Sequence, residues 1–224
     1  MICQGKGILA IWHDLDPAGE ADFREWHTRQ HMPERLSVPG FLRGCRYIAV
    51  KGTPQLFNFY QTESPETLTS AAYVERLNNP TPWTQQVVPY FRNINRSAGR
   101  VLASLGAGEG GAIATLRIKP REEAREALSN WLQAEGLASA LQQAAIAAVH
   151  LWSADPAASL IETAESRARV GATAVADLTV AIEGNDAEFA EAAANWLQQQ
   201  PVFSNALQSP AELGVYRLQH RIGS

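Results

Sequence analysis

Residues 7–26 read GILAIWHDLDPAGEADFREW, and residues 112–131 read AIATLRIKPREEAREALSNW. Both stretches begin with an apolar run that is rich in β-branched residues, pass through a polar segment that contains proline, and end in tryptophan. The tryptophans are Trp26 and Trp131, so an offset of 105 residues relates the two stretches. Such self-similarity indicates a chain built from two copies of one structural unit.

The repeat continues beyond these stretches. The same offset carries FLRGCRYIAV (41–50) onto IAAVHLWSAD (146–155). After an insertion of 16 residues in the second half, an offset of 121 aligns FNFY (57–60) with LTVA (178–181). Each half therefore predicts the order strand, helix, strand, strand, helix, strand.

Runs of β-branched and aromatic residues between glycines and prolines predict the strands of the first half. These strands are 6–13, 41–51, 55–63 and 99–105. The first helix is expected to begin near Pro17, because proline suits a first helical position. Proline at position 33 disfavours helix at the residue before it, so this helix is expected to kink or end near His31.

A βαββαβ unit forms a four-stranded antiparallel sheet with both helices on one face, which is the ferredoxin-like arrangement. Two such units can place their bare sheet faces together and close an α+β barrel within one chain. We therefore predict an α+β fold of two fused ferredoxin-like repeats, residues 1–106 and 111–224, joined at the glycine-rich stretch LGAGEGG (105–111). The first repeat is expected to hold the pocket and the second to serve mainly as scaffold.

Composition narrows the class of partner. The 224 residues carry a formal net charge of −4 with acidic and basic residues interspersed, which does not favour nucleic acid or an anionic membrane surface. Two cysteines form no disulfide framework, and no apolar run is long enough to span a bilayer. We expect a cytoplasmic protein with a small-molecule partner, and a homodimer remains open.

The run from Asp22 to Tyr47 contains D-F-x-x-W-H-x-x-x-H-x-P-E-R-L-x-V-P-G-F followed by R-x-x-R-Y. This pattern resembles the EthD-like branch of the dimeric α+β barrel superfamily. The resemblance implies a ligand pocket between the helices and the sheet of a unit, with His31 as the family-type histidine. It leaves the reaction open, because the superfamily includes cofactor-independent monooxygenases, muconolactone-type isomerases, haem enzymes and proteins without assigned activity. His27 departs from the tyrosine that is more typical of related sequences.

The repeat serves as an internal control on the histidines. At the offset of 105, His13 aligns with Ile118, His27 with Leu132 and His31 with Gly136, whereas Trp26 keeps a tryptophan partner. Residues of a site in one half need no counterpart in the other, so we name His31, His13 and His27 as candidate catalytic acid/base residues. Substitution among polar residues on an exposed helix would give the same pattern. A histidine in a last helical turn also interacts favourably with the negative end of the helix, which is a structural reason for its presence.

Aromatic residues supply candidate walls for a pocket. Trp12, Tyr47, Tyr60 and Trp83 are the predicted substrate-binding residues, with the alternative that they belong to the core. Trp83 lies in NNPTPWTQQVVPYFRN (78–93), whose three prolines and three aromatic residues predict a rigid lid.

We expect neither metal nor cofactor. His27 and His31 have a spacing that could place two imidazoles on one cation, but the acidic residue of an H-E-x-x-H motif is missing. Haem would have only His150 and His220 as axial ligands in the second half, both on predicted strands.

Two functions fit these residues. One is an EthD-like small-molecule-binding protein that acts as a cofactor-independent isomerase, lyase or monooxygenase on an aromatic or lactone-like metabolite. The other is a non-catalytic binding or interaction module. The sequence leaves open whether the chain is an enzyme.

Overall fold

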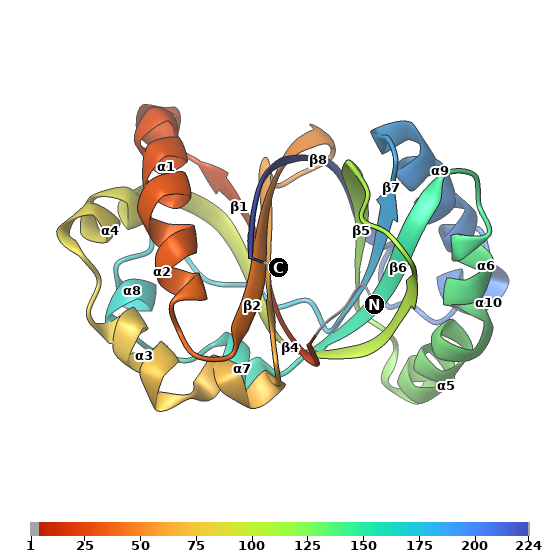
Figure 1. The fold of residues 1–224 in the computed structure, drawn as a ribbon. Coiled ribbons are helices and arrows are strands. Elements are labelled where there is room, and N and C mark those ends of the chain that lie inside the picture. The colour runs from red at the N-terminus through yellow and green to blue at the C-terminus, as the bar shows by residue number, and fades with distance from the viewer. Residues whose placement is uncertain (1–4, 224) are drawn as a thin grey trace.

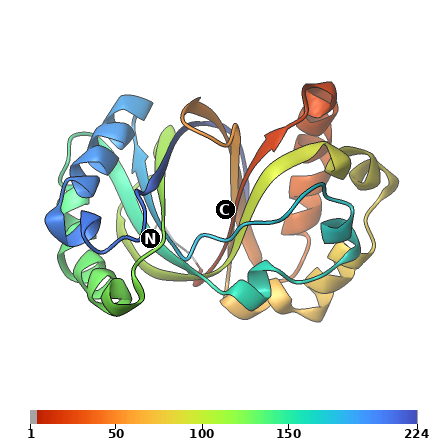
Figure 2. The same cartoon turned by 180° about the vertical axis from the view of Figure 1, so that it is seen from behind.

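Eight antiparallel strands form a closed barrel, and helices pack on the outside along two opposite sides (Figures 1 and 2). The computed structural model describes residues 5–223. The strands are β1 (Gly7–Leu15), β2 (Phe41–Lys51), β3 (Leu56–Thr62), β4 (Phe91–Gly106), β5 (Ala112–Ile118), β6 (Ile146–Ala154), β7 (Leu178–Gly184) and β8 (Glu212–Gly223). The helices are α1 (Glu20–Trp26), α2 (Met32–Leu36), α3 (Ala71–Asn78), α4 (Pro82–Val87), α5 (Arg125–Trp131), α6 (Leu137–Leu141), α7 (Pro156–Ser159), α8 (Ala164–Arg167), α9 (Ala187–Gln198) and α10 (Pro201–Ser204).

The strand order around the barrel is β1-β3-β2-β8-β5-β7-β6-β4. The first half therefore contributes the adjacent strands β4-β1-β3-β2, and the second contributes β8-β5-β7-β6, which is the same order. The pairs β2–β8 and β4–β6 join the two sheets and close the barrel. The predicted fold class, two fused ferredoxin-like repeats that close one α+β barrel, is confirmed.

The offset of 105 relates the first two helices of each half residue for residue, since α1 corresponds to α5 and α2 to α6. The register of β3 and β7 corrects the second offset: Gly7 pairs with Thr62 and Ala112 with Gly184, which gives 122 in place of 121. A slip of one residue reverses the faces of a strand. The error arose because both strands are buried on both faces, so neither shows the alternation of apolar and polar residues that fixes an alignment.

The first helix begins as predicted. Asp16 caps a 3₁₀ turn at Pro17–Gly19, and α1 follows. Of the two predicted outcomes near His31, a kink or an end, the helix does not end there. A π-helical turn at His27–His31 interrupts the regular helix and joins α1 to α2, and the helical run reaches Leu36.

In this turn the Met32 N–H bonds the His27 carbonyl, five residues back. The second half has the same turn at Leu132–Gly136, where the Leu137 N–H bonds the Leu132 carbonyl. Because Ala138 stands there at the position equivalent to Pro33, proline does not cause the turn. The π turn belongs to the repeated scaffold.

The barrel interior is filled by large side chains from both halves. Its buried aromatic residues are Trp12, Tyr47, Phe57, Phe59, Trp152 and Tyr216. Trp12 stacks on Phe57 at 4.8 Å between ring centroids, and its indole N–H donates to Thr115 Oγ1 of the second half at 3.1 Å. This interior is the interface between the halves.

The segment between β6 and β7, residues 155–177, crosses from the second half onto the helical side of the first. We call it the covering segment; it carries α7 and α8, which lie beside α3 and β4 in both ribbon views (Figures 1 and 2). Its backbone is tied to β4 by hydrogen bonds, among them Ala174 N–H to Ile94 O at 2.8 Å. The Ser159 hydroxyl oxygen accepts from the Ala98 N–H at 2.9 Å. This segment is the insertion that separates the two offsets.

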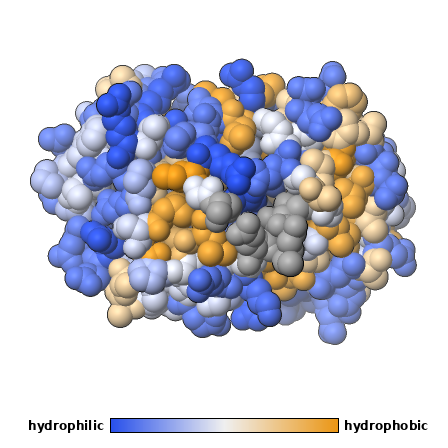
Figure 3. All heavy atoms as spheres, viewed as in Figure 1, coloured by the Kyte–Doolittle hydropathy of each residue, from blue (hydrophilic) through white to orange (hydrophobic). Residues whose placement is uncertain are grey.

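The face of the molecule seen in Figure 3 is mixed in hydropathy. On the face shown in Figure 3, hydrophilic residues are spread over both helical sides with hydrophobic residues interspersed among them. No helix of the described part of the chain is long and apolar enough to cross a membrane.

The barrel interior predicts a large effect of truncation. Phe57 is fully buried, so Phe57→Ala should lower the free energy of unfolding by about 3–5 kcal/mol through lost burial and a cavity between the halves. Val50→Ala is the matched control: its side chain is 57 % exposed, and its effect should stay within about 0.5 kcal/mol. Urea unfolding followed by tryptophan fluorescence measures both. Equal effects of the two variants would contradict an interior that holds the halves together.

Candidate functional site

A small cavity lies between the helical layer of the first half and the outer face of its sheet. Its volume is about 30 Å³, which suits one water molecule. Its walls are Ile11, Trp26, His27, His31, Asn58, Tyr60, Val88, Phe91, Ile94, Glu165 and Arg169. Two of the three predicted catalytic histidines therefore line one cavity, together with predicted Tyr60.

The π turn places His27 and His31 side by side. Their rings are stacked with centroids 5.3 Å apart, and the ring of Trp26 lies 4.2 Å from that of His31. Both histidines are buried. The sequence expectation of a helix-terminal histidine is replaced by a pair inside a continuous helix.

His27 is held as a neutral donor. The guanidinium of Arg46 can only donate, so its contact of 3.4 Å with Nδ1 makes that nitrogen the acceptor. The proton then lies on Nε2, which faces the Tyr60 hydroxyl at 3.5 Å. Burial lowers the pKa of His27 well below its ordinary value, and the neighbouring His31 and Arg46 lower it further.

His31 differs from His27 because one of its nitrogens is unused. Nδ1 is buried and has no hydrogen-bond partner among the described residues. Burial lowers the pKa of His31 well below its ordinary value, and the charges of Arg35 and Arg169 add to this. A neutral imidazole with a free nitrogen can accept a proton or a hydrogen bond from a ligand.

His13, the third predicted catalytic histidine, lies apart from the cavity. It does not line the cavity, and both of its nitrogens are satisfied: Nδ1–H donates to the Asp14 carbonyl at 3.1 Å, and Nε2 accepts from Asn58 Nδ2 at 3.1 Å. Its ring stacks on Phe91 at 4.2 Å. Burial lowers the pKa of His13 to about 4, so it is neutral at physiological pH.

The sheet adds two polar groups to the cavity. Burial raises the pKa of Tyr60, so its hydroxyl keeps its proton and can donate to an oxyanion. Asn58 Oδ1 is buried without a partner among the described residues. Unsatisfied buried polar atoms are uncommon, and several around one cavity indicate a place for a bound molecule.

The other predicted substrate-binding residues lie elsewhere. Trp12 and Tyr47 belong to the barrel interior, on the opposite face of the sheet from the histidines. Trp83 lies in α4, half-buried, and its indole N–H donates to Asp22 Oδ1 at 2.8 Å. The predicted lid 78–93 folds as α4, a 3₁₀ turn and the start of β4, because the last strand begins at Phe91 and not at residue 99.

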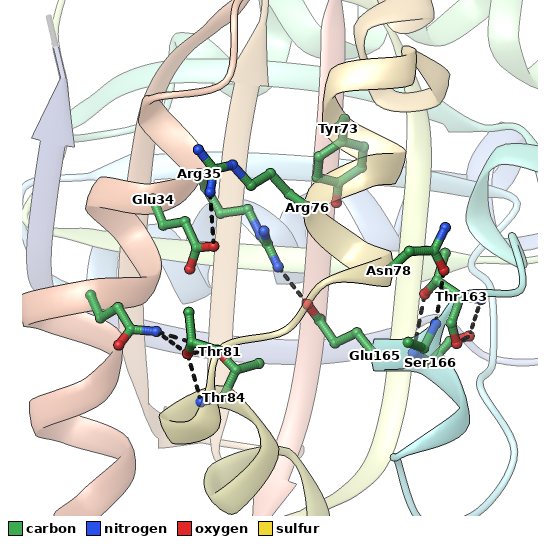
Figure 4. Close-up of polar contacts among 12 residues, drawn as sticks. Glu34, Arg35, Tyr73, Arg76, Asn78, Thr81, Thr84, Thr163, Glu165 and Ser166 are labelled. Carbon is green, nitrogen blue, oxygen red and sulfur yellow. Dashed lines mark hydrogen bonds and ion pairs between the residues drawn. The ribbon is translucent and has the colours of Figure 1, made fainter.

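The residues that sequence reasoning missed come from the covering segment. Glu165 of α8 and the following Arg169 line the cavity although they belong to the second half. Glu165 pairs with Arg35 of α2 at 2.5 Å (Figure 4) and with Arg169 at 2.8 Å. Burial alone would raise the pKa of Glu165, but Arg35 and Arg169 hold it below its ordinary value. In the sequence, the insertion in the second half was the only sign of this segment. Its length did not reveal that it crosses onto the first half.

In the second half the equivalent positions are apolar. The counterparts of His27, Asn58 and Tyr60 are Leu132, Val180 and Ile182, which belong to a buried apolar core. Gly136 replaces His31, and a Cβ there would lie 2.9 Å from the Trp131 ring. The scaffold is therefore repeated while the site is not.

The histidine cavity does not fit a metal or haem. Residues 5–223 contain no group of three histidine, cysteine or carboxylate side chains that could hold a metal ion. The cavity of about 30 Å³ is far too small for a porphyrin. His150 is buried in the barrel, where Nε2 contacts Glu183 at 3.1 Å and Nδ1 contacts Ser104 Oγ at 2.7 Å, so neither nitrogen is available as an axial ligand.

No protein-family model and no curated protein sequence matches the chain. Solved structures do. An anthrone oxidase-like protein aligns with a TM-score of 0.67 at 13 % identity, covering 98 % of this chain and 93 % of its own. A candidate monooxygenase from Fusobacterium nucleatum aligns with 0.58 at 8 % identity, covering 98 % and 95 %. A heme-binding protein from Thermus thermophilus aligns with 0.50 at 10 % identity, covering 96 % and 92 %. At these identities the likeness shows the dimeric α+β barrel fold alone.

The lowered histidine pKa values predict acid sensitivity. Between pH 6.5 and about 4 the unfolded chain binds a proton at residue 13 that the folded chain does not, so stability is complete above pH 6.5 and falls as the pH drops toward 4. For His13 alone the loss should approach about 3 kcal/mol. Urea unfolding at several pH values measures it. His13→Gln should flatten this dependence; an unchanged slope in that variant would contradict the assignment.

The buried ion pair of the covering segment gives a second test. Glu165→Gln leaves Arg35 buried without a counter-charge and should lower the free energy of unfolding by about 3–5 kcal/mol. It should also speed proteolytic cleavage within residues 155–177. Glu162→Gln, on the same segment but exposed, is the control and should have little effect. If the two variants behave alike, the pair does not hold the segment in place.

Proposed function

We propose that this protein binds a small, largely apolar aromatic or lactone-like molecule at the histidine cavity and acts on it without a cofactor. Isomerisation, lyase chemistry and oxygenation fit such a site, and oxygenation is the reaction that we favour. The free Nδ1 of buried His31 is the observation that carries the proposal. His31 is assigned as the base that takes a proton from the substrate.

The surroundings of His31 suit proton transfer. A general base must be unprotonated before the reaction, and the lowered pKa of His31 ensures this at neutral pH. The same low pKa makes it a weak base, so the substrate anion must be stabilised as it forms. The Tyr60 hydroxyl, whose oxygen faces the Nε2–H of His27, is the donor that can do so, and Arg169 adds positive charge.

The names of structural neighbours support an oxidative reaction. One neighbour is described as anthrone oxidase-like and another as a candidate monooxygenase. In a cofactor-free oxygenation of this kind, His31 takes a proton from an activated C–H group. The resulting carbanion reduces dioxygen, and loss of water from the peroxide leaves a ketone.

Entry requires movement of side chains. A cavity of about 30 Å³ admits water but no aromatic ring, so the Glu165 and Arg169 side chains must swing aside when the ligand binds. Both belong to the covering segment, which is therefore the part expected to move. Trp83 of α4 takes no part in this step, since its indole N–H is bound to Asp22.

The closed cavity also favours the second candidate, a non-catalytic binding module. In that case the histidines shape a binding site and no proton is transferred.

We further propose, from the motif at Asp22–Tyr47, that the chain is EthD-like. A cytoplasmic location and a homodimer complete the proposal.

The oxidation of anthrone tests the catalytic role, with anthrone and dioxygen giving anthraquinone and water. His31→Gln should reduce the rate at least about a hundredfold while the far-ultraviolet circular dichroism stays unchanged. Arg29→Gln is the control, because that side chain is 72 % exposed on the same helical run. The appearance of anthraquinone by absorbance gives the rate.

Equal rates for His31→Gln and the unmodified protein would remove His31 from the mechanism. Binding of anthrone without any turnover, followed by shifts of the histidine NMR signals, would support the binding module instead.

A further inference from the structure

A second cavity lies beside the histidine cavity, between α3 and the covering segment. Its volume is about 210 Å³. The walls are Leu77, Arg96, Ser159, Leu160, Ile161, Glu162, Thr163, Ser166, Arg167, Arg169 and Thr173. We call it the outer cavity. Arg169 is the one described residue that lines both cavities, so its side chain stands where they meet.

The outer cavity has the size of a single substituted ring. A cavity of about 150 Å³ lined by apolar groups holds benzene in a well-studied protein, so about 210 Å³ accommodates a benzene ring with one small substituent. Leu77, Leu160 and Ile161 give this cavity an apolar side. The remaining walls are polar or charged.

The charges around the two cavities do not balance. Three arginines line the outer cavity, Arg96, Arg167 and Arg169, against one carboxylate, that of Glu162. Arg35 adds a fourth positive charge nearby, and Glu165 is shared between Arg35 and Arg169. Buried charge that lacks a counter-charge is costly, so an anionic ligand would be stabilised here.

The three arginines of the outer cavity differ in exposure and in the hydrogen bonds that their guanidinium groups already make. The guanidinium of Arg96 is committed to the Ala158 and Ser159 carbonyls, both at 2.8 Å, and to the Tyr73 hydroxyl. Arg167 is exposed. Arg169 is bound through Nη2 to Glu165, a carboxylate that Arg35 also holds, and its side chain is 11 % exposed.

Arg35 of α2 also favours an anionic ligand at this place. Its Nη1 is buried and has no hydrogen-bond partner among the described residues. A negative group at Arg169 would relieve the excess of positive charge on this side of α2.

We propose that the ligand of this site is a small aromatic carboxylate and that Arg169 binds its carboxylate group. The inference rests on the proposed function and names the substrate class. A carboxylate at Arg169 lies where the two cavities join, so the ring extends into the outer cavity. The ligand atoms next to the carboxylate are then the ones nearest to His31. Arginine suits this role because its planar guanidinium forms two parallel hydrogen bonds with a carboxylate.

Benzoate and benzamide test the proposal, because they have nearly the same shape and differ in charge. Isothermal titration should show that the unmodified protein binds benzoate at least about tenfold more tightly than benzamide. Arg169→Gln should abolish this preference while the affinity for benzamide changes little, and Arg169→Lys should retain part of it. Arg76→Gln is the control for general charge effects, since Arg76 is 52 % exposed on α3 and lines neither cavity.

Thermal unfolding of each variant shows that a lost preference is not lost folding. Equal affinities for benzoate and benzamide, no binding of benzoate at millimolar concentration, or a preference that survives Arg169→Gln would overturn the proposal.

The two proposals can fail separately. His31→Gln should keep the affinity for benzoate within a few-fold, because the carboxylate site lies at Arg169. A benzoate preference that depends on Arg169 in a protein that does not oxidise anthrone would support the carboxylate site and count against the oxygenase. Oxidation of anthrone that depends on His31, without a preference for benzoate, would support the oxygenase and overturn the carboxylate site.

Discussion

Burial of two sheet faces against each other is the constraint on which the rest of this structure depends. Each half forms a four-stranded sheet with helices on one face only, and the other face would expose a continuous apolar surface. Pairing β2 with β8 and β4 with β6 closes both sheets into one barrel, which hides the apolar faces and leaves no unpaired edge. Large aromatic side chains fill the interior, so the barrel is a core.

Because the barrel is filled, the proposed ligand site lies in the space between helices and sheet. The two halves use that space differently. In the second half leucine, valine and isoleucine side chains occupy it, with Leu132 and Ile182 at the positions of His27 and Tyr60. In the first half polar side chains stand at the same positions, and burial keeps the histidines neutral. The second half contributes to the cavity of the first half instead, because its covering segment supplies Glu165 and Arg169 to the cavity wall.

Much of the fold could be predicted because the repeat is carried by apolar patterns that the scaffold requires. Trp26 and Trp131 mark the same helical position, and the offset between them holds through both π turns. The π turn itself could not be predicted. Pro33 was the signal in the sequence near it, but the second half forms the same turn with Ala138 at the equivalent position. Nor could strand faces be assigned, because residues on both faces of β1 and β2 are buried. Trp12 and Tyr47 were therefore expected beside the histidines and lie across the sheet from them.

The site was predictable only in the part that lies within one repeat. His27, His31 and Tyr60 stand on elements whose pairing follows from the fold class, so a histidine without a counterpart was informative. Glu165 and Arg169 reach the cavity through contacts between segments far apart in the chain, and such contacts leave no periodic pattern.

Those two residues nevertheless determine the electrostatics of the site. Without the covering segment, Arg35 would face solvent, and His31 would not lie beside two guanidinium groups that disfavour its protonation. The segment thus supplies the negative charge that permits Arg35 to be buried and a positive charge at the junction of the cavities. A molecule that reaches His31 must exchange contacts with Glu165 or Arg169. In the proposed site, the binding of an anion and the exposure of the histidine nitrogen are therefore coupled through the same pair of side chains.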